Sequence, residues 1–213
     1  QQFSNPTTID PGVRMPVMDQ FALSLERTLF KDAAAGITFT SRKFTDFIAR
    51  VNTGAVWSPE SFAFTDENGQ AQSIDVFRKT SPSSQDAFLV TNPAEGGAPS
   101  AIVTPENAFT GVTVFFEKRF SNKWMFHADY TYGRAKGNHT NLMSGGNGAT
   151  TNYLNPNLQI NSYGFLPYDP THNLQVYGSV ELPLGISFSP RLSVRSGNPW
   201  TRDVKLTFSG SPR

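Results

Sequence analysis

Apolar and polar residues alternate along six stretches of the chain, and this period of two predicts β-strands. The clearest case is residues 109–132, where two alternating segments flank a very short polar turn at Ser121-Asn122, a pattern typical of a β-hairpin. The same pattern predicts two more hairpins, with turns at Lys31-Asp32-Ala33 and Pro183-Leu184-Gly185. The expected strands cover approximately residues 18–29, 35–50, 109–120, 123–134, 172–182 and 186–197.

Each expected strand has one apolar side and one polar side. In residues 123–134, Trp124, Phe126 and Tyr130 share one side, whereas His127 and Asp129 share the other. A strand of about ten residues is long enough to cross a bilayer when tilted, with lipid on one side and a hydrated interior on the other. The pattern therefore predicts an all-β fold, a segment of an antiparallel transmembrane β-barrel.

A soluble all-β module that binds carbohydrate or acts as an adhesin is the alternative, because a two-layer sandwich shows the same alternation. In that case the apolar side chains of the sheet would be buried against one another. The alternative therefore predicts burial of Trp124, Phe126, Val176 and Leu192.

The lengths of the connections favour the barrel. The turns within the expected hairpins are short, but the connections at residues 52–108 and 133–170 are long. Outer-membrane barrels show this asymmetry, with short periplasmic turns and long extracellular loops. Residues 61–78 contain a small hairpin signal around Asn68-Gly69. We expect loop in residues 1–17 and in the rest of the first connection, without a compact core.

Composition and charge narrow the function. Hydrophobic residues make up 38% of the 213 residues, and no apolar run approaches the roughly 18 residues of a spanning helix. The net charge of +1 gives no indication of a nucleic-acid partner. The chain has no cysteine, which excludes disulfides and thiolate metal sites.

The charged residues are distributed between the two sides in a way that suits a membrane wall. Those on the apolar side (Arg27, Lys43 and Lys118) lie near strand ends, where a cation costs about 0–1 kcal/mol rather than about 2–4 at mid-membrane. Pro190 falls inside the last expected strand and requires a bulge or a shifted register there. The candidate residues facing the barrel lumen are Glu26, Arg42, Glu117, His127, Asp129, Glu181, Arg191 and Arg195, and the candidate aromatic residues at the lipid interface are Phe120, Trp124, Tyr130 and Tyr132.

Motifs for catalysis or metal binding are missing from the sequence. None of His127, His139 and His172 has a partner at a metal-binding spacing, and we find no nucleophile elbow or phosphate-binding loop. His127 and Asp129 could bind a substrate or respond to protons, but we favour a simple hydrated pair in the lumen. We therefore expect no catalytic residues, no metal and no cofactor, and a protein that is not an enzyme.

Several short motifs, spread over nearly the whole chain, resemble the later barrel strands of TonB-dependent outer-membrane receptors of the Oar-like group, which carry a carboxypeptidase-regulatory-like domain. Each motif alone is short, so the resemblance rests on their common order. The motifs are Ile9-Asp10-Pro11, residues 16–21, Glu26-Arg27, residues 111–124, Tyr130-Thr131-Tyr132, residues 169–174, Leu182-Pro183-Leu184-Gly185 and Ser196-Gly197-Asn198-Pro199-Trp200.

This resemblance implies a barrel of about 22 strands closed around a plug, in the bacterial outer membrane. It also implies that outer-membrane lipid surrounds the barrel, that the loops bind an extracellular ligand, and that the TonB complex drives import through the plug. No plug domain is visible in the sequence, and six strands cannot enclose one. We therefore expect the chain to be an internal or C-terminal piece of a larger receptor.

Overall fold

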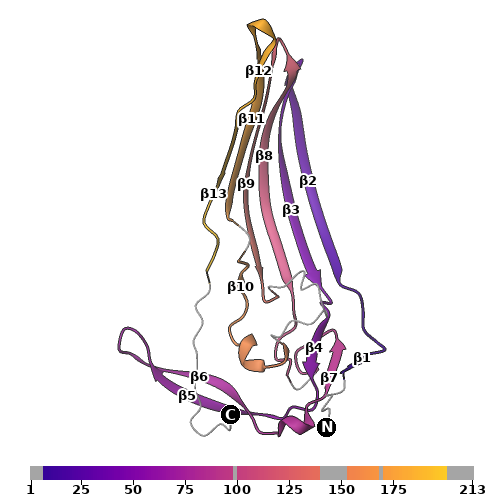
Figure 1. Cartoon of the computed structure of the whole chain (residues 1–213), viewed down its shortest axis with the longest axis vertical. Coiled ribbons are helices and arrows are strands. Elements are labelled where there is room, and N and C mark those ends of the chain that lie inside the picture. Colours follow the sequence, from indigo (N-terminus) through magenta and orange to yellow (C-terminus); the bar gives the residue numbers. More distant parts are fainter. Residues whose placement is uncertain (1–6, 98–99, 140–152, 168–169, 201–213) are drawn as a thin grey trace.

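The computed structural model describes residues 7–97, 100–139, 153–167 and 170–200, and it is built almost entirely of strands (Figure 1). Short 3-10 helices lie at Ser83–Gln85 (η1), Pro156–Gln159 (η3) and Pro183–Gly185 (η4). The strands are β1 (Thr7–Ile9), β2 (Val17–Phe30), β3 (Ala33–Thr45), β4 (Ala49–Asn52), β5 (Trp57–Thr65), β6 (Ala71–Lys79), β7 (Phe88–Thr91), β8 (Asn107–Ser121), β9 (Trp124–Gly137), β10 (Gly164–Phe165), β11 (His172–Leu182), β12 (Ile186–Phe188) and β13 (Arg191–Arg195).

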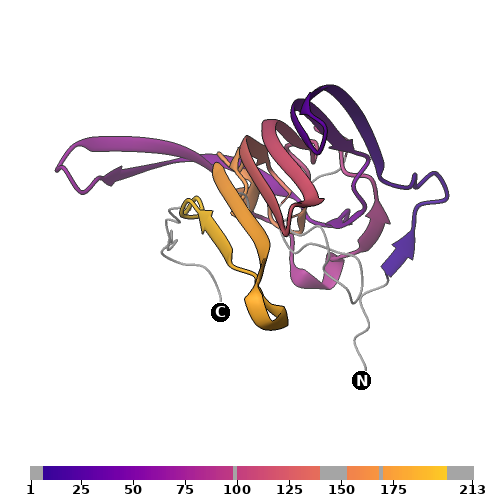
Figure 2. The same ribbon diagram turned by 90° about the horizontal axis from the view of Figure 1, so that it is seen from above.

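The largest sheet within the described residues has the order β12-β11-β9-β8-β3-β2, with β13 also on β11 and β10 on β9. All of its pairings are antiparallel. Seen from above, its strands follow an arc that does not close (Figure 2). The expected antiparallel meander of long strands is therefore confirmed, as an open segment of a barrel wall.

The three tight turns of this sheet lie together at one end, and the long connections lie at the other (Figure 1). Asn122 and Lys123 join β8 to β9 and both have positive φ, 52° and 68°, as a type I′ hairpin turn requires. Leu184 and Gly185 also have positive φ between β11 and β12. The turn after β11 lies where the sequence predicts it, whereas the turn between β8 and β9 lies one residue later than the expected Ser121-Asn122.

The register sorts the side chains of the large sheet onto two faces, with local shifts near the turn end between Thr28 and Phe30 and between Lys118 and Ser121. Strand neighbours place Leu25, Ile37, Val114, Tyr130, Leu174 and Val194 in one row across the sheet. The adjacent row, on the opposite face, contains Ser24, Thr38, Thr113, Thr131, Asn173 and Arg195. Because the side chains of a strand alternate between faces, the sheet has an apolar face and a polar face across its whole width.

No second layer covers the large sheet within the described residues, where the extensive contacts of its strands are with their neighbours in the same sheet. Val114 is 42% exposed, Trp124 41% and Leu192 54%. The soluble two-layer alternative required Trp124, Phe126, Val176 and Leu192 to be buried. Trp124 and Leu192 are exposed, and Phe126 and Val176 are only half-buried, so the structure contradicts it. Transfer of one such large apolar side chain out of water contributes about 1.5–3 kcal/mol, which the protein gains only if lipid covers this face.

Strand β3 is shorter than the sequence pattern predicts. We expected it to continue to about residue 50, but it ends at Thr45, and β4 belongs to a different sheet. Asp46 adopts a positive φ of 55° and its carboxylate accepts a hydrogen bond from Arg14. This local turn redirects the chain, although the alternation of residue types runs on through it.

The region expected to be loop is partly folded, which corrects the prediction for residues 1–17 and 52–108. Strands β1, β7 and β4 form a three-stranded sheet, in which β1 and β7 run parallel. A small core of Ala49, Val51, Ala101 and Tyr153 packs beside it, with Leu89 against it. The hairpin signal at residues 61–78 is present as β5–β6, which projects away from the rest of the molecule (Figure 1). Residues 140–152 and 168–169 of the second connection lie outside the described residues.

Pro190 interrupts the last strand without shifting it. The register between β11 and β12 pairs Val180 with Phe188, and the register between β11 and β13 pairs Tyr177 with Arg191, so both follow one alignment. The Gly178 amide still donates to the Pro190 carbonyl at 3.2 Å. The expected bulge or register shift is therefore wrong, because the proline loses one ladder hydrogen bond and nothing else moves.

Candidate functional site

The register places all eight candidate lumen residues on the polar face of the large sheet. Glu26 and Asp129 lie in one row across the strands, and Glu117, His127 and Arg191 lie in the next row. The others on this face are Arg42, Glu181 and Arg195.

Within the described part of the chain these polar side chains form no tight cluster, and His127 and Asp129 are the pair in direct contact. The Nε2 of His127 lies 3.3 Å from the Oδ1 of Asp129, and the His127 ring stacks on Tyr177 with centroids 4.7 Å apart. Arg191 donates to the side-chain oxygen of Gln175 at 3.2 Å. Among the described residues, no group of three or more His, Asp or Glu side chains is arranged to hold a metal ion.

Hydroxyl pairs cross between strands on the same polar face. Ser24 and Thr38 lie 3.0 Å apart, Thr113 and Thr131 2.9 Å, and Ser179 and Ser189 2.9 Å. Neutral hydroxyl pairs of this kind satisfy each other's hydrogen bonds and can still face water or another polar surface. The polar face is therefore suited to a hydrated interior.

Trp124, Tyr130 and Tyr132, three of the four candidate interface aromatics, lie on the apolar face of β9, and Phe120 lies in β8 at the register shift between Lys118 and Ser121. Phe120 and Trp124 are at the turn end, while Tyr130 and Tyr132 are towards the loop end. The eight residues from Trp124 to Tyr132 span roughly 27 Å along the strand, or about 20 Å along the membrane normal at a tilt of about 40°. This separation approaches the apolar band of about 25 Å that aromatic residues flank in outer-membrane barrels.

Lys118 lies on the apolar face but directs its charge into the β8–β9 turn. Its side chain is 5% exposed, and its Nζ donates to the Ser121 hydroxyl at 2.8 Å and to the Ser121 and Trp124 carbonyls, both at 3.1 Å. The same Nζ lies 4.1 Å from the centroid of the Trp124 ring. The lysine therefore caps the turn, and its long stem covers apolar surface, as snorkelling lysines do.

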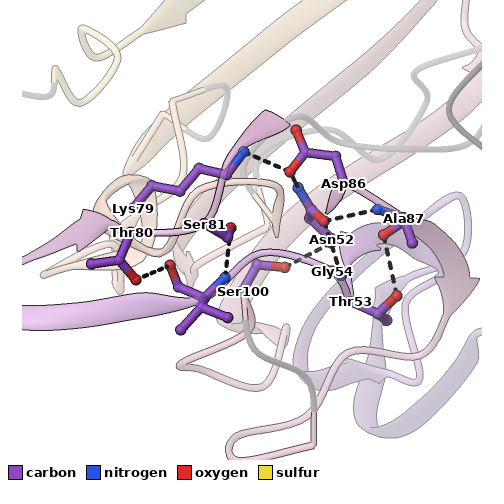
Figure 3. A network of polar contacts seen from close by, with 10 residues as sticks. Asn52, Thr53, Gly54, Lys79, Thr80, Ser81, Asp86, Ala87 and Ser100 are labelled. Atoms are coloured by element: carbon purple, nitrogen blue, oxygen red, sulfur yellow. Dashed lines mark hydrogen bonds and ion pairs between the residues drawn. The ribbon is translucent and has the colours of Figure 1, made fainter. Parts of the chain in front are cut away.

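At the loop end, a polar network fastens the β5–β6 hairpin to the small three-stranded sheet (Figure 3). Lys79, at the end of β6, lies 2.5 Å from the carboxylate of Asp86. The side chain of Asn52 in β4 donates to the same carboxylate at 2.9 Å, and its backbone amide donates to the Ser100 hydroxyl at 2.8 Å. Burial alone would raise the pKa of Asp86, but the hydrogen bonds from Lys79 and Asn52 outweigh burial and hold that pKa below its usual value.

The hairpin has its own polar fastenings. Arg78 and Glu60 form a two-point ion pair at 2.6 and 3.1 Å, which lowers the pKa of Glu60. The side-chain amide of Asn157, in η3, accepts from the Phe77 amide and donates to the Phe77 carbonyl, both at 2.7 Å. Asn157 thereby occupies the position of a neighbouring strand at the edge of β6.

The family comparison gives this geometry its context. Residues 2–198 match the family model described as "Outer membrane beta barrel domain". The chain belongs to this outer-membrane barrel family. Its location is therefore the bacterial outer membrane.

The expected resemblance to Oar-like receptors is also confirmed. The chain is 24% identical over 206 residues to the "TonB-dependent transporter Oar" of Myxococcus xanthus. The alignment covers 91% of this chain but spans only 16% of that relative. No solved structure gives a significant match to the chain. Among the described residues, none of the helices has the length and apolar character needed to cross a bilayer.

No pattern in the sequence predicted the polar network at the base of the hairpin. Asn52, Lys79, Asp86 and Ser100 come from four separate places in the chain, and no spacing rule connects them. The strand expected at residues 123–134 is longer in the structure. β9 continues to Gly137 and brings Lys136 onto the apolar face. Here a signal did exist, because Tyr132, Arg134 and Lys136 keep the same spacing of two.

Proposed function

We propose that this chain is part of the barrel of an outer-membrane TonB-dependent receptor that binds a ligand at the cell surface and imports it. The observation that carries the proposal is the sheet itself, with one apolar and one polar face and with its long connections gathered at one end. The similarity to a protein named as a TonB-dependent transporter supports the same function.

In this proposal the long connections face outward and the tight turns near Lys31, Ser121 and Leu184 face the periplasm. The small sheet, its core and the β5–β6 hairpin then form a folded platform above the membrane. Such a platform presents the ligand with a fixed surface, which lowers the entropy lost on binding compared with unstructured loops.

Within the barrel, the eight candidate lumen residues would face the plug or line the path of the ligand. Phe120, Trp124, Tyr130 and Tyr132 would stand at the lipid interfaces. About 22 strands in total would close around a plug, and the TonB complex would act on that plug. Import would then be conformational gating without covalent chemistry, in keeping with a family of barrels rather than enzymes.

The test begins with the full-length protein that contains this chain. It should require detergent, and its gel mobility should change on heating. Recovery as a monodisperse, detergent-free monomer would refute the proposal.

A second arm uses planar bilayers. The closed barrel should conduct little until mild denaturant displaces the plug, after which a large pore should open. In the open pore, E117Q/D129N should reduce the preference for cations, whereas R27Q, on the apolar face, should leave ion selectivity unchanged. Equal effects of the two variants would contradict the lumen assignment.

A further inference from the structure

The apolar face of β9 ends in two cations. Arg134 pairs with Thr110 and Lys136 with Ala108, in the register that also pairs Tyr132 with Val112. No register shift interrupts β9 between Tyr132 and Lys136, so the three side chains lie on the same face. Both cations are exposed.

A single aromatic ring holds the two cations next to each other. Phe165 in β10 pairs with Lys136, and its ring centroid lies 4.9 Å from the Lys136 Nζ and 5.3 Å from the Arg134 guanidinium carbon. Arg134 also lies 5.9 Å from the ring centroid of Tyr132. Cation–π contacts of this kind orient a cation and leave its N–H groups able to donate to another partner.

The positive charge at this point is not cancelled by the described residues around it. Among them, no carboxylate forms an ion pair with Arg134 or Lys136, whereas Lys43 in the same row is paired with Glu106 at 3.0 Å. Within the described part of the chain, Arg134 and Lys136 are therefore two cations without a carboxylate partner on the apolar face.

Their depth corresponds to the lipid headgroups. Arg134 and Lys136 lie two and four residues beyond Tyr132, which is roughly 5 and 10 Å further along the membrane normal at the usual strand tilt. The apolar band ends near the aromatic row, so these cations stand where lipid phosphates are found.

We propose that Arg134 and Lys136, seated on Phe165, form a binding site for the phosphate of an outer-leaflet lipid. The inference rests on the proposed orientation, in which the loop end faces outward. A guanidinium binds phosphate oxygens through two parallel N–H groups, and an adjacent ammonium adds a second charge. Basic pockets at the headgroup level of other membrane proteins bind anionic lipids by the same chemistry.

The test measures binding of bisphosphorylated lipid A to the purified full-length protein in detergent by native mass spectrometry. We expect R134Q/K136Q to bind at least tenfold more weakly than the wild type, and R134K/K136R to retain most of the binding. R42Q is the matched control for lipid binding, because Arg42 lies at the same rim on the opposite face and contacts the Phe109 ring at 5.9 Å. Heat-dependent gel mobility verifies folding, and K136Q alone replaces the double variant if that one does not insert.

Three results would overturn the inference: unchanged binding by R134Q/K136Q, an equal loss in R42Q, or displacement of the lipid by millimolar inorganic phosphate, which would indicate a site for a free anion. Import does not enter this measurement, so its outcome is separate from that of the proposed function. Protease added to intact cells should cut the β5–β6 hairpin, and protection of that hairpin would contradict the orientation instead.

Discussion

Lys118 shows how one residue reconciles charge with a lipid-facing position. The sequence predicts that Lys118 lies on the apolar face and near the end of its strand. Its hydrogen bonds to the carbonyls of Ser121 and Trp124 depend on side-chain geometry that no sequence pattern encodes. Hydrogen bonds from a charged group contribute about 1.5–3 kcal/mol each in favourable cases, and here they stabilise a turn that also requires two residues with positive φ.

We predict that K118M destabilises the full-length protein by about 1–3 kcal/mol, because the turn carbonyls lose a charged donor while the apolar stem remains. Urea unfolding in detergent would measure this change. The control is K31Q, since Lys31 is exposed in another turn at the same end of the sheet. A K118M protein as stable as K31Q would show that the cap contributes nothing.

The Asp86 carboxylate makes the stability of the platform depend on pH in the acid range. Its pKa is lowered in the folded protein, so its contribution is complete above the unfolded value near 3.9 and is lost as the pH falls through the lower, folded value. We predict that pepsin cuts the β5–β6 region of the full-length protein faster as the pH falls below about 4. D86N should be cut faster than the wild type at the upper end of this range and should show less acceleration on acidification. An identical pH profile for D86N would contradict the assignment.

At the scale of elements, local signals predicted the structure well where the elements are local. The three long hairpins and the β5–β6 hairpin each have their turn residues next to the alternation that they join, so the sequence specifies them directly. The parallel pairing of β1 with β7 joins Thr7 to Phe88, and no short-range signal encodes such a distant contact. For this reason the folded platform could not be predicted, and the end of β3 was placed five residues too late, at residue 50 instead of Thr45.

The two hydrogen bonds between the Asn157 side chain and the Phe77 backbone lead to a prediction about strand β6. N157A should leave the edge of β6 unpaired at Phe77 and loosen the hairpin from η3, at a cost of about 1–3 kcal/mol for the two bonds. Hydrogen exchange of the full-length protein in detergent should show faster exchange in β6. N68A at the hairpin tip is the control. Equal protection of the β6 amides from exchange in N157A and in the wild type would contradict the role of Asn157.

At the scale of the whole molecule, the sequence predicted the two faces of the wall because they follow from a period of two. The register preserves this period along the long strands, apart from shifts near the turns in β2 and β8. The distribution of polar residues on one side, including Glu117 and His127, came from the same rule. In the proposed function, the polar face contacts a plug and a ligand reaches the platform. The chain corresponds to only 16% of the length of its curated relative, so those partners belong to the proposal rather than to the fold.

The central claim is that lipid covers one face of this sheet and that water or a plug meets the other. The chain has no cysteine, so single substitutions can carry a spin label, provided that the rest of the full-length protein is freed of cysteines. Labels at V114C, F126C and V176C in liposomes should be relaxed mainly by oxygen, which dissolves in lipid, and T113C and H127C should not be. The account predicts this alternation, and similar oxygen accessibility at neighbouring positions such as 113 and 114, or a reversed pattern, would contradict it.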